Sequence, residues 1–88
     1  MPYLLIRHKV RDFNAWKPVY DAHLAAREAA GLRELHLLRN VEDATEVVLL
    51  FEAENLGKAR EFARSEDLQH AMARAGVTDQ PDIYCLDR

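Results

Sequence analysis

One stretch, residues 46–53 (EVVLLFEA), most limits how this chain can fold. In a β-strand successive side chains point to opposite faces, so Val47, Leu49 and Phe51 share one face. The two residues between them, a valine and a leucine, share the other face. A strand that is apolar on both faces must be covered on both sides. The stretch therefore predicts a strand inside a sheet and not at its edge.

Three other segments predict strands because they are rich in β-forming residues: 3–10, 33–40 and 82–86. The polar segment 41–45 predicts a hairpin loop of about five residues, so the strands on either side of it run antiparallel. Two shorter helical patterns follow, at 56–64 and 66–76. Asn55 and Ser65 can cap these helices with their side-chain oxygens.

The longest helical pattern runs from Asp12, which can cap its start, to Gly31, which can end it in a left-handed conformation. Pro18 lies beyond the first turn, where proline removes an amide donor, so we expect one helix with a kink or an irregular first turn there. One stripe of this helix begins with aromatic residues and then contains two residues with polar side chains, a histidine and an arginine. It comprises Phe13, Trp16, Tyr20, His23, Leu24 and Arg27. The helix therefore either buries polar groups or lines a cavity.

The element order βαββαβ predicts a ferredoxin-like α+β sandwich, a four-stranded antiparallel sheet in the order 4-1-3-2 backed by helices. Helices on one side leave the second sheet face bare, although several strands are apolar there too. A second copy of the chain would cover this face. We therefore expect a homodimer with a small-molecule pocket in each subunit, between sheet and helices.

Composition restricts the classes of function. A chain of 88 residues forms one domain, 1–88, with one thin core. The net charge of −3 gives no long-range attraction for nucleic acid or anionic lipid. The apolar runs are too short to span a membrane and the N-terminus lacks a signal-peptide pattern, so a cytoplasmic location is expected. The single cysteine, Cys85, excludes an intramolecular disulfide and a zinc site built on several thiolates.

The element order resembles the dimeric α+β barrel superfamily, and most of all its small antibiotic biosynthesis monooxygenase-like proteins. The stretches DFNAWKPVYDAHLAAREAAG (12–31) and FARSEDLQHAMARAGVTDQPDIYCL (62–86) carry the resemblance. It implies a dimeric α+β barrel. It also implies a pocket for a small aromatic or polyketide-like compound, in a superfamily that contains cofactor-free monooxygenases and cyclases. No cofactor is expected. Haem degradation is not expected either, because Arg7 and His8 stand in the first strand where that branch has an asparagine, and Phe62 or Ala63 stands where it has a tryptophan.

The catalytic candidates are His23, Arg27 and Tyr20. His23 and Arg27 are one helical turn apart, so an imidazole that moves a proton can lie beside a guanidinium that stabilises an enolate or phenolate. The resemblance gives Tyr20 the role of an orienting hydroxyl. The alternative remains open that Arg27 pairs with an acid, that His23 bonds a backbone carbonyl, and that the cavity is filled by the protein's own side chains. The function is then non-catalytic ligand binding or a structural homodimer.

Three further residues are candidates for substrate binding: Trp16, His8 and His36. Trp16 can provide an aromatic wall, although aromatic residues at this spacing also fit an ordinary core. His8 and His36 lie on strands that are not neighbours in the expected order, so a shared metal ion is not expected. The three glycines are far apart, which excludes a glycine-rich phosphate loop.

Overall fold

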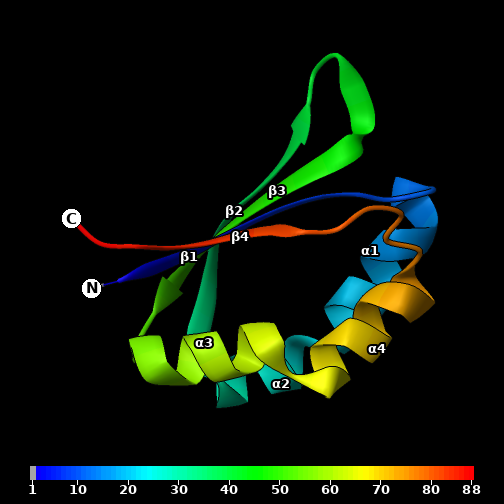
Figure 1. Cartoon of the computed structure of the whole chain (residues 1–88). Coiled ribbons are helices and arrows are strands. Elements are labelled where there is room, and N and C mark those ends of the chain that lie inside the picture. The colour runs from blue at the N-terminus through cyan, green and yellow to red at the C-terminus, as the bar shows by residue number, and fades with distance from the viewer. Residues whose placement is uncertain (1) are drawn as a thin grey trace.

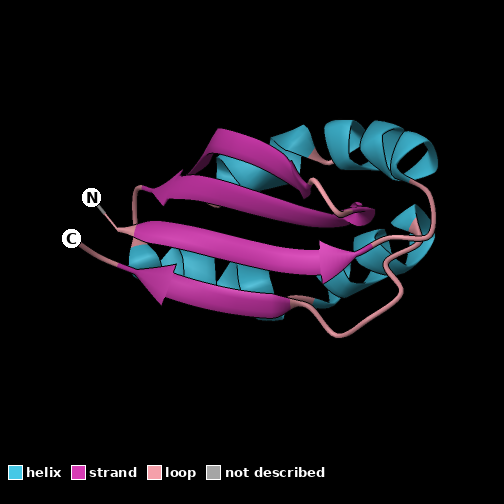
Figure 2. Cartoon of the chain, turned by 90° about the horizontal axis from the view of Figure 1, so that it is seen from above, coloured by secondary structure: helices cyan, strands magenta, loops and turns pink. Residues whose placement is uncertain are grey.

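A computed structural model describes residues 2–88 of the chain. Its elements are β1 (Tyr3–Lys9), α1 (Phe13–Ala22), α2 (Leu24–Ala29), β2 (Leu32–Asn40), β3 (Asp43–Ala53), α3 (Leu56–Arg64), α4 (Glu66–Ala75) and β4 (Asp82–Leu86). The strands form one antiparallel sheet in the order β2-β3-β1-β4, and all the helices lie on one side of it (Figures 1 and 2). The ferredoxin-like α+β fold and its strand order are confirmed.

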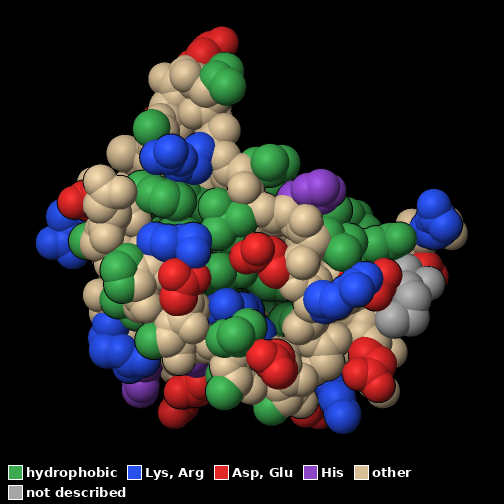
Figure 3. All heavy atoms as spheres, turned by 180° about the vertical axis from the view of Figure 1, so that it is seen from behind, with side chains coloured by type: hydrophobic (Ala, Val, Ile, Leu, Met, Phe, Trp, Pro, Cys, Tyr) green, Lys and Arg blue, Asp and Glu red, His purple; other side chains and the backbone are tan. Residues whose placement is uncertain are grey.

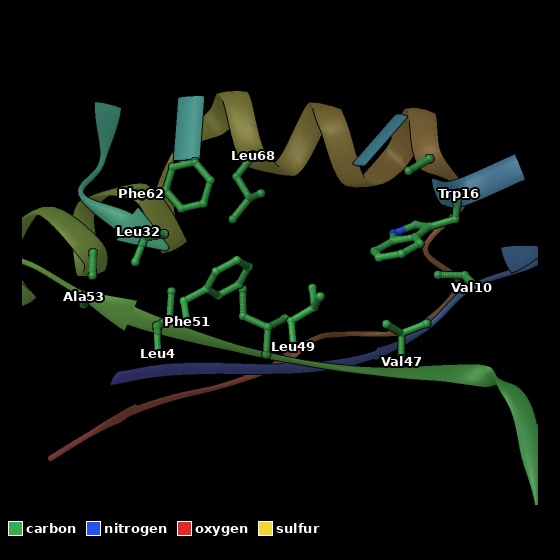
Figure 4. Packing of buried hydrophobic residues seen from close by; sticks show 13 residues of the cluster. Leu4, Val10, Trp16, Leu32, Val47, Leu49, Phe51, Ala53, Phe62 and Leu68 are labelled. Atoms are coloured by element: carbon green, nitrogen blue, oxygen red, sulfur yellow. The ribbon is translucent and has the colours of Figure 1, made fainter. Parts of the chain in front are cut away.

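The core lies between the sheet and the helices. On β3, Val47, Leu49 and Phe51 are buried on the helix side, as the alternation predicts, and Leu4 and Ile6 of β1 lie opposite Phe51 and Leu49. Trp16 of α1 closes one end of this layer, while Phe62 and Leu68 approach the sheet from α3 and α4 at the other (Figure 4). The core is therefore one layer deep, as a short chain requires.

The prediction of one long helix over residues 12–31 is wrong in one respect: the helix breaks at His23, not at Pro18. Pro18 lies inside α1 on its exposed side, where water can bond the carbonyl that lost its amide partner. At the break, the Tyr20 carbonyl accepts the His23 amide at 3.1 Å and Arg27 Nη1 at 2.6 Å. The side chain of Arg27 thus bonds a carbonyl that would accept a backbone amide in a continuous helix. Leu24, which was predicted to lie in the same stripe, is exposed.

The remaining predicted boundaries are close to the observed ones, with one further correction. The connection between β2 and β3 is two residues long, Val41 and Glu42, and not about five, because β3 begins earlier than its apolar run. The caps at Asn55 and Ser65 are confirmed, since their side chains accept the amides of Lys58 and Leu68 at 3.1 Å. No helix within residues 2–88 is both long enough and apolar enough to cross a membrane.

The second face of the sheet, which we call the open face, has no helix over it (Figure 2). Strand register places these apolar side chains on it: Tyr3, Leu5, Leu38, Val48, Leu50, Tyr84 and Leu86. Leu38 and Tyr84 are more than half exposed. The hairpin of β2 and β3 projects beyond the body of the molecule (Figure 1). On the side of the molecule seen in Figure 3, hydrophobic side chains reach the surface among charged ones.

Candidate functional site

A small cavity lies between the helices and the sheet. Its volume is about 50 Å³, well below the roughly 300–1,000 Å³ of pockets that hold drug-sized ligands. Its wall is mostly apolar and aromatic, and within residues 2–88 it includes no carboxylate. Five of the predicted site residues line it: His8, Trp16, Tyr20, His23 and Arg27.

Aromatic rings stack along the α1 side of the cavity. The rings of Trp16 and Tyr20 are stacked with their centroids 4.8 Å apart and their planes 20° apart. The ring of Phe13 lies 5.6 Å from that of Trp16 on the far side, and the guanidinium of Arg27 covers Tyr20. Residues spaced three or four apart meet on one helix face, which is why α1 can build this stack from consecutive turns. The result is a rigid aromatic wall.

Arg27 is the most deeply buried cation of the site, with 6% of its surface exposed. Its guanidinium carbon lies 3.7 Å from the centre of the Tyr20 ring, and its Nη1 donates a 2.6 Å hydrogen bond to the Tyr20 carbonyl. No carboxylate within residues 2–88 forms an ion pair with it. The positive charge is therefore held by the negative end of α1 and by an aromatic face. Its edge borders the cavity.

The Tyr20 hydroxyl donates a 2.6 Å hydrogen bond to Glu34 Oε1. Burial, and then this hydrogen bond to a carboxylate, raise the pKa of Tyr20 above its usual range. The phenol therefore stays protonated at neutral pH. In this arrangement its proton is directed to β2 and not to the cavity.

His23 stands at the junction of α1 and α2. Its Nε2 lies 2.8 Å from Asp67 Oδ2, which belongs to the first turn of α4, and its ring lies 5.9 Å from that of Phe62. This hydrogen bond joins the two helix pairs across the cavity. A carboxylate that fixes one ring nitrogen is also what orients an imidazole for proton transfer.

His8 is the most unusual polar group of the site. Its side chain reaches the helix side of the sheet from β1, only 3% of the residue is exposed, and neither ring nitrogen has a hydrogen-bond partner within residues 2–88. Burial lowers the pKa of His8 to about 4, so the imidazole is neutral at pH 7. The ring meets Trp16 edge to face, with centroids 5.7 Å apart.

His36 does not join this group. It lies opposite Leu50 in the register of β2 and β3, on the open face, and β3 separates its strand from that of His8. The two histidines are therefore on opposite faces of the sheet. Within the part of the chain that the structure describes, no three His, Cys, Asp or Glu side chains are grouped as metal ligands would be.

Sequence reasoning missed a charged cluster on the open face, which is centred on Arg7. Its guanidinium contacts Glu46 and Asp82 at 2.8 Å and Asp79 at 2.9 Å. Hydrogen bonds to these carboxylates raise the pKa of Arg7, while hydrogen bonds from Asn40 and then Arg7 lower the pKa of Glu46. The alternation of side chains along β1 did predict that Arg7 and His8 lie on opposite faces of the sheet. Glu46 of β3, Asp82 of β4 and Asp79 of the loop before β4 gave no local signal, because they meet Arg7 only in the folded sheet.

Comparison with solved structures identifies the fold. A proposed antibiotic biosynthesis monooxygenase from Bordetella bronchiseptica superposes with a TM-score of 0.78 at 14% identity, over 99% of this chain and 95% of the other. A second one, from Caulobacter crescentus, superposes with a TM-score of 0.74 at 16% identity, over 99% of this chain and 88% of the other. The chain has the antibiotic biosynthesis monooxygenase fold.

This likeness concerns the fold and not the reaction. An uncharacterized NIPSNAP domain protein from Burkholderia xenovorans also superposes, with a TM-score of 0.66 at 9% identity over 100% of this chain and 94% of the other. Proteins with different names therefore share the architecture, and a fold of this kind hosts several chemistries. The sequence matches no family model, and no curated protein matches it significantly.

Proposed function

We propose that this chain is a cytoplasmic homodimer of the antibiotic biosynthesis monooxygenase type that oxygenates or cyclises a small aromatic or polyketide-like compound without a metal or organic cofactor. The observation that carries the proposal is the cavity in which an aromatic wall meets two imidazoles and a buried guanidinium. Apolar walls with a few convergent polar groups are typical of sites for small planar molecules. Without a cofactor the substrate itself supplies the electrons that reduce O₂, which favours an electron-rich phenol.

In this proposal His23 moves the proton and Arg27 stabilises the resulting anion, while Trp16 and His8 bind the substrate. Tyr20 orients the substrate through its hydroxyl oxygen, which can still accept a hydrogen bond while its proton is donated to Glu34. The 2.8 Å contact of His23 with Asp67 supports the first role, because a fixed imidazole is a better general base. The partly free edge of the Arg27 guanidinium supports the second. His36, on the open face, contributes to a pocket only through the second subunit.

The open face supports the dimer. Its apolar side chains come from all four strands, and burying them against a second copy would remove a patch that an isolated subunit exposes to water. A twofold axis brings the same patch of each subunit together, so the surface must complement itself. The mixed apolar and charged composition of this face fits such a contact.

The experiment uses 1,4-dihydroxynaphthalene as an electron-rich probe. Dissolved oxygen is followed in aerated buffer with the protein, without it, and with the His23→Phe variant, and the product is identified by mass. We expect the wild-type protein to accelerate oxygen consumption at least ten-fold over buffer and His23→Phe to lose most of that gain. Equal rates with and without protein, over a panel of one-ring hydroquinones and catechols as well as naphthols, would reject catalysis.

The second candidate function is a homodimer that binds a ligand, or fills its own cavity, and does no chemistry. The cavity volume of about 50 Å³ favours it, because this space holds only a few water molecules unless side chains move. The internal bonds of Arg27 and of the Tyr20 hydroxyl favour it as well. Ligand binding without turnover in the same assay would support this alternative.

A further inference from the structure

The unpaired imidazole of His8 is costly to bury. A buried polar group without a hydrogen bond costs roughly 1–3 kcal/mol, and most buried polar groups in proteins have a partner. Both ring nitrogens of His8 lack one within residues 2–88, yet the strand position would accept an apolar residue such as its neighbours Ile6 and Val10. The ring of His8 forms part of the wall of the cavity. Something that enters the cavity can therefore satisfy it.

We propose that His8 is the recognition point of this cavity and that the ligand is a small neutral aromatic molecule carrying at least one hydroxyl or N–H group, such as a simple phenol. This inference rests on the proposed function, since it names the substrate class of the same site. The hydroxyl donates to the unprotonated ring nitrogen, and the ring of the ligand packs against the aromatic wall. A neutral imidazole offers one acceptor and one donor, and it discriminates by hydrogen bonding and not by charge.

Charge argues for a neutral ligand. The wall has no carboxylate to attract a cation, and Arg27 already bonds the Tyr20 carbonyl and covers the Tyr20 ring. An anion entering this apolar space would lose its hydration with only one partly used guanidinium to replace it. A neutral hydroxyl loses much less hydration free energy on entering the cavity, and it can form a hydrogen bond with the unpaired imidazole of His8.

Size argues for one ring with few substituents. A ring needs more room than the present 50 Å³, so side chains must move to admit it. Met72 lines the cavity, is half-buried, and has the flexible side chain best suited to such repacking. Trp16 and Phe51 are fixed in the core and set the limit on the other side.

The test compares phenol with toluene, which has nearly the same shape but no hydroxyl, and with benzoate, which adds a charge. Binding is measured by calorimetry and by the ¹⁵N shifts of the imidazoles. We expect phenol to bind at least ten-fold more tightly than toluene and to shift the His8 nitrogens, and benzoate to bind more weakly than either. The variant His8→Leu should reverse this preference and bind toluene more tightly than phenol, because the phenol hydroxyl then loses its hydration without gaining a partner.

The outcomes separate two failures. If phenol and toluene bind equally to the wild-type protein, or benzoate binds best, the role of His8 is wrong while the pocket of the proposed function remains. If no aromatic probe of one or two rings binds, the inference and the pocket both fail. His8→Leu removes an unpaired buried polar group, so it should fold, and toluene binding to it shows that the cavity is intact.

Discussion

Arg27 caps the helix that precedes it through two contacts with Tyr20: its Nη1 donates to the Tyr20 carbonyl at 2.6 Å, and its guanidinium carbon lies 3.7 Å from the centre of the Tyr20 ring. The first contact holds a positive charge at the C-terminal end of α1, where the helix dipole favours it. The second orders the ring that continues into Trp16. One side chain thus ends a helix, fixes an aromatic wall and borders the cavity.

Replacing Arg27 with lysine should destabilise the fold although it keeps the charge. Lysine cannot lay a planar guanidinium over Tyr20, and its single ammonium cannot bond the carbonyl in the same position. We expect the free energy of unfolding to fall by about 1–3 kcal/mol, from one charged hydrogen bond and one cation–π contact. Urea denaturation measures this. Arg33→Lys, at an exposed ion pair with Glu52, is the control and should change stability by less than about 0.5 kcal/mol.

If the two substitutions have the same small effect, the contacts of Arg27 with Tyr20 do not stabilise the helix junction.

The stability of the protein should fall as pH is lowered from about 6.5 towards 4, because of His8. Burial lowers the pKa of His8 to about 4, while an unfolded histidine has a pKa near 6.5. Between these values the unfolded chain binds a proton that the folded chain does not, so acidification favours unfolding. The loss over this range is about 3 kcal/mol at most. Urea unfolding at pH 4.5, 5.5, 6.5 and 7.5 measures it.

His8→Leu is the matched variant for this titration. It should be as stable as the wild-type protein or more stable at pH 7, and its stability should vary less between pH 4.5 and 6.5. The paired carboxylates Glu46 and Asp79 have lowered pKa values, so they lose their contribution only at more acidic pH and do not obscure the comparison. An unchanged slope in His8→Leu would mean that another group causes the acid sensitivity.

Much of the fold could be predicted because its signals are local. Alternating apolar residues gave the faces of β3, and side-chain caps gave the starts of α3 and α4. The break at His23 could not be predicted, because it depends on Arg27 reaching back to a carbonyl seven residues earlier. The position of Pro18 suggested a kink there. The kink is unnecessary because Pro18 lies on the exposed side of α1, where water can bond the free carbonyl.

The candidate site was predictable only in its residue types. The helical stripe selected Trp16, Tyr20, His23 and Arg27, and strand alternation put His8 on the core side. No pattern in the sequence shows that the His8 ring nitrogens have no hydrogen-bond partner within residues 2–88, since that depends on how the surrounding elements pack. In the Arg7 cluster, Arg7 bonds acids that lie 39 to 75 positions further along the chain, and only the folded sheet brings them to it.

The dimer proposal predicts that one charge on the open face separates the subunits. Leu38 is 55% exposed there, and Leu38→Asp would place an unpaired carboxylate inside the proposed interface. We expect the wild-type protein to sediment as a dimer at 10 µM and Leu38→Asp as a monomer. Leu24→Asp is the control, because Leu24 is 51% exposed on α2, away from this face, and it should stay dimeric.

A wild-type monomer at 100 µM would exclude the homodimer. A monomer in both variants would show that the effect is not specific to the open face.

The Arg7 cluster predicts a second acid-sensitive element, on the opposite side of the sheet from His8. Arg7→Gln should destabilise the protein at pH 7, because Glu46, Asp79 and Asp82 would then repel one another without a central cation. The lowered pKa values of Glu46 and Asp79 show the sign: the folded state favours their charged forms, so the stability they contribute is present at neutral pH and lost as pH falls below about 4. The difference between wild type and Arg7→Gln should therefore shrink on acidification. It should also shrink in 1 M salt, which screens a partly exposed cluster.

The measurement is urea unfolding of both proteins at pH 7 and pH 3, with carboxyl titration by NMR to follow Glu46 and Asp79. Their pKa values should rise towards the ordinary range in Arg7→Gln, and Arg33→Gln, at an exposed pair, should leave them unchanged. A difference between wild type and Arg7→Gln that stays constant from pH 7 to pH 3 would show that Arg7 acts by packing its aliphatic stem on the sheet, and not by its charge.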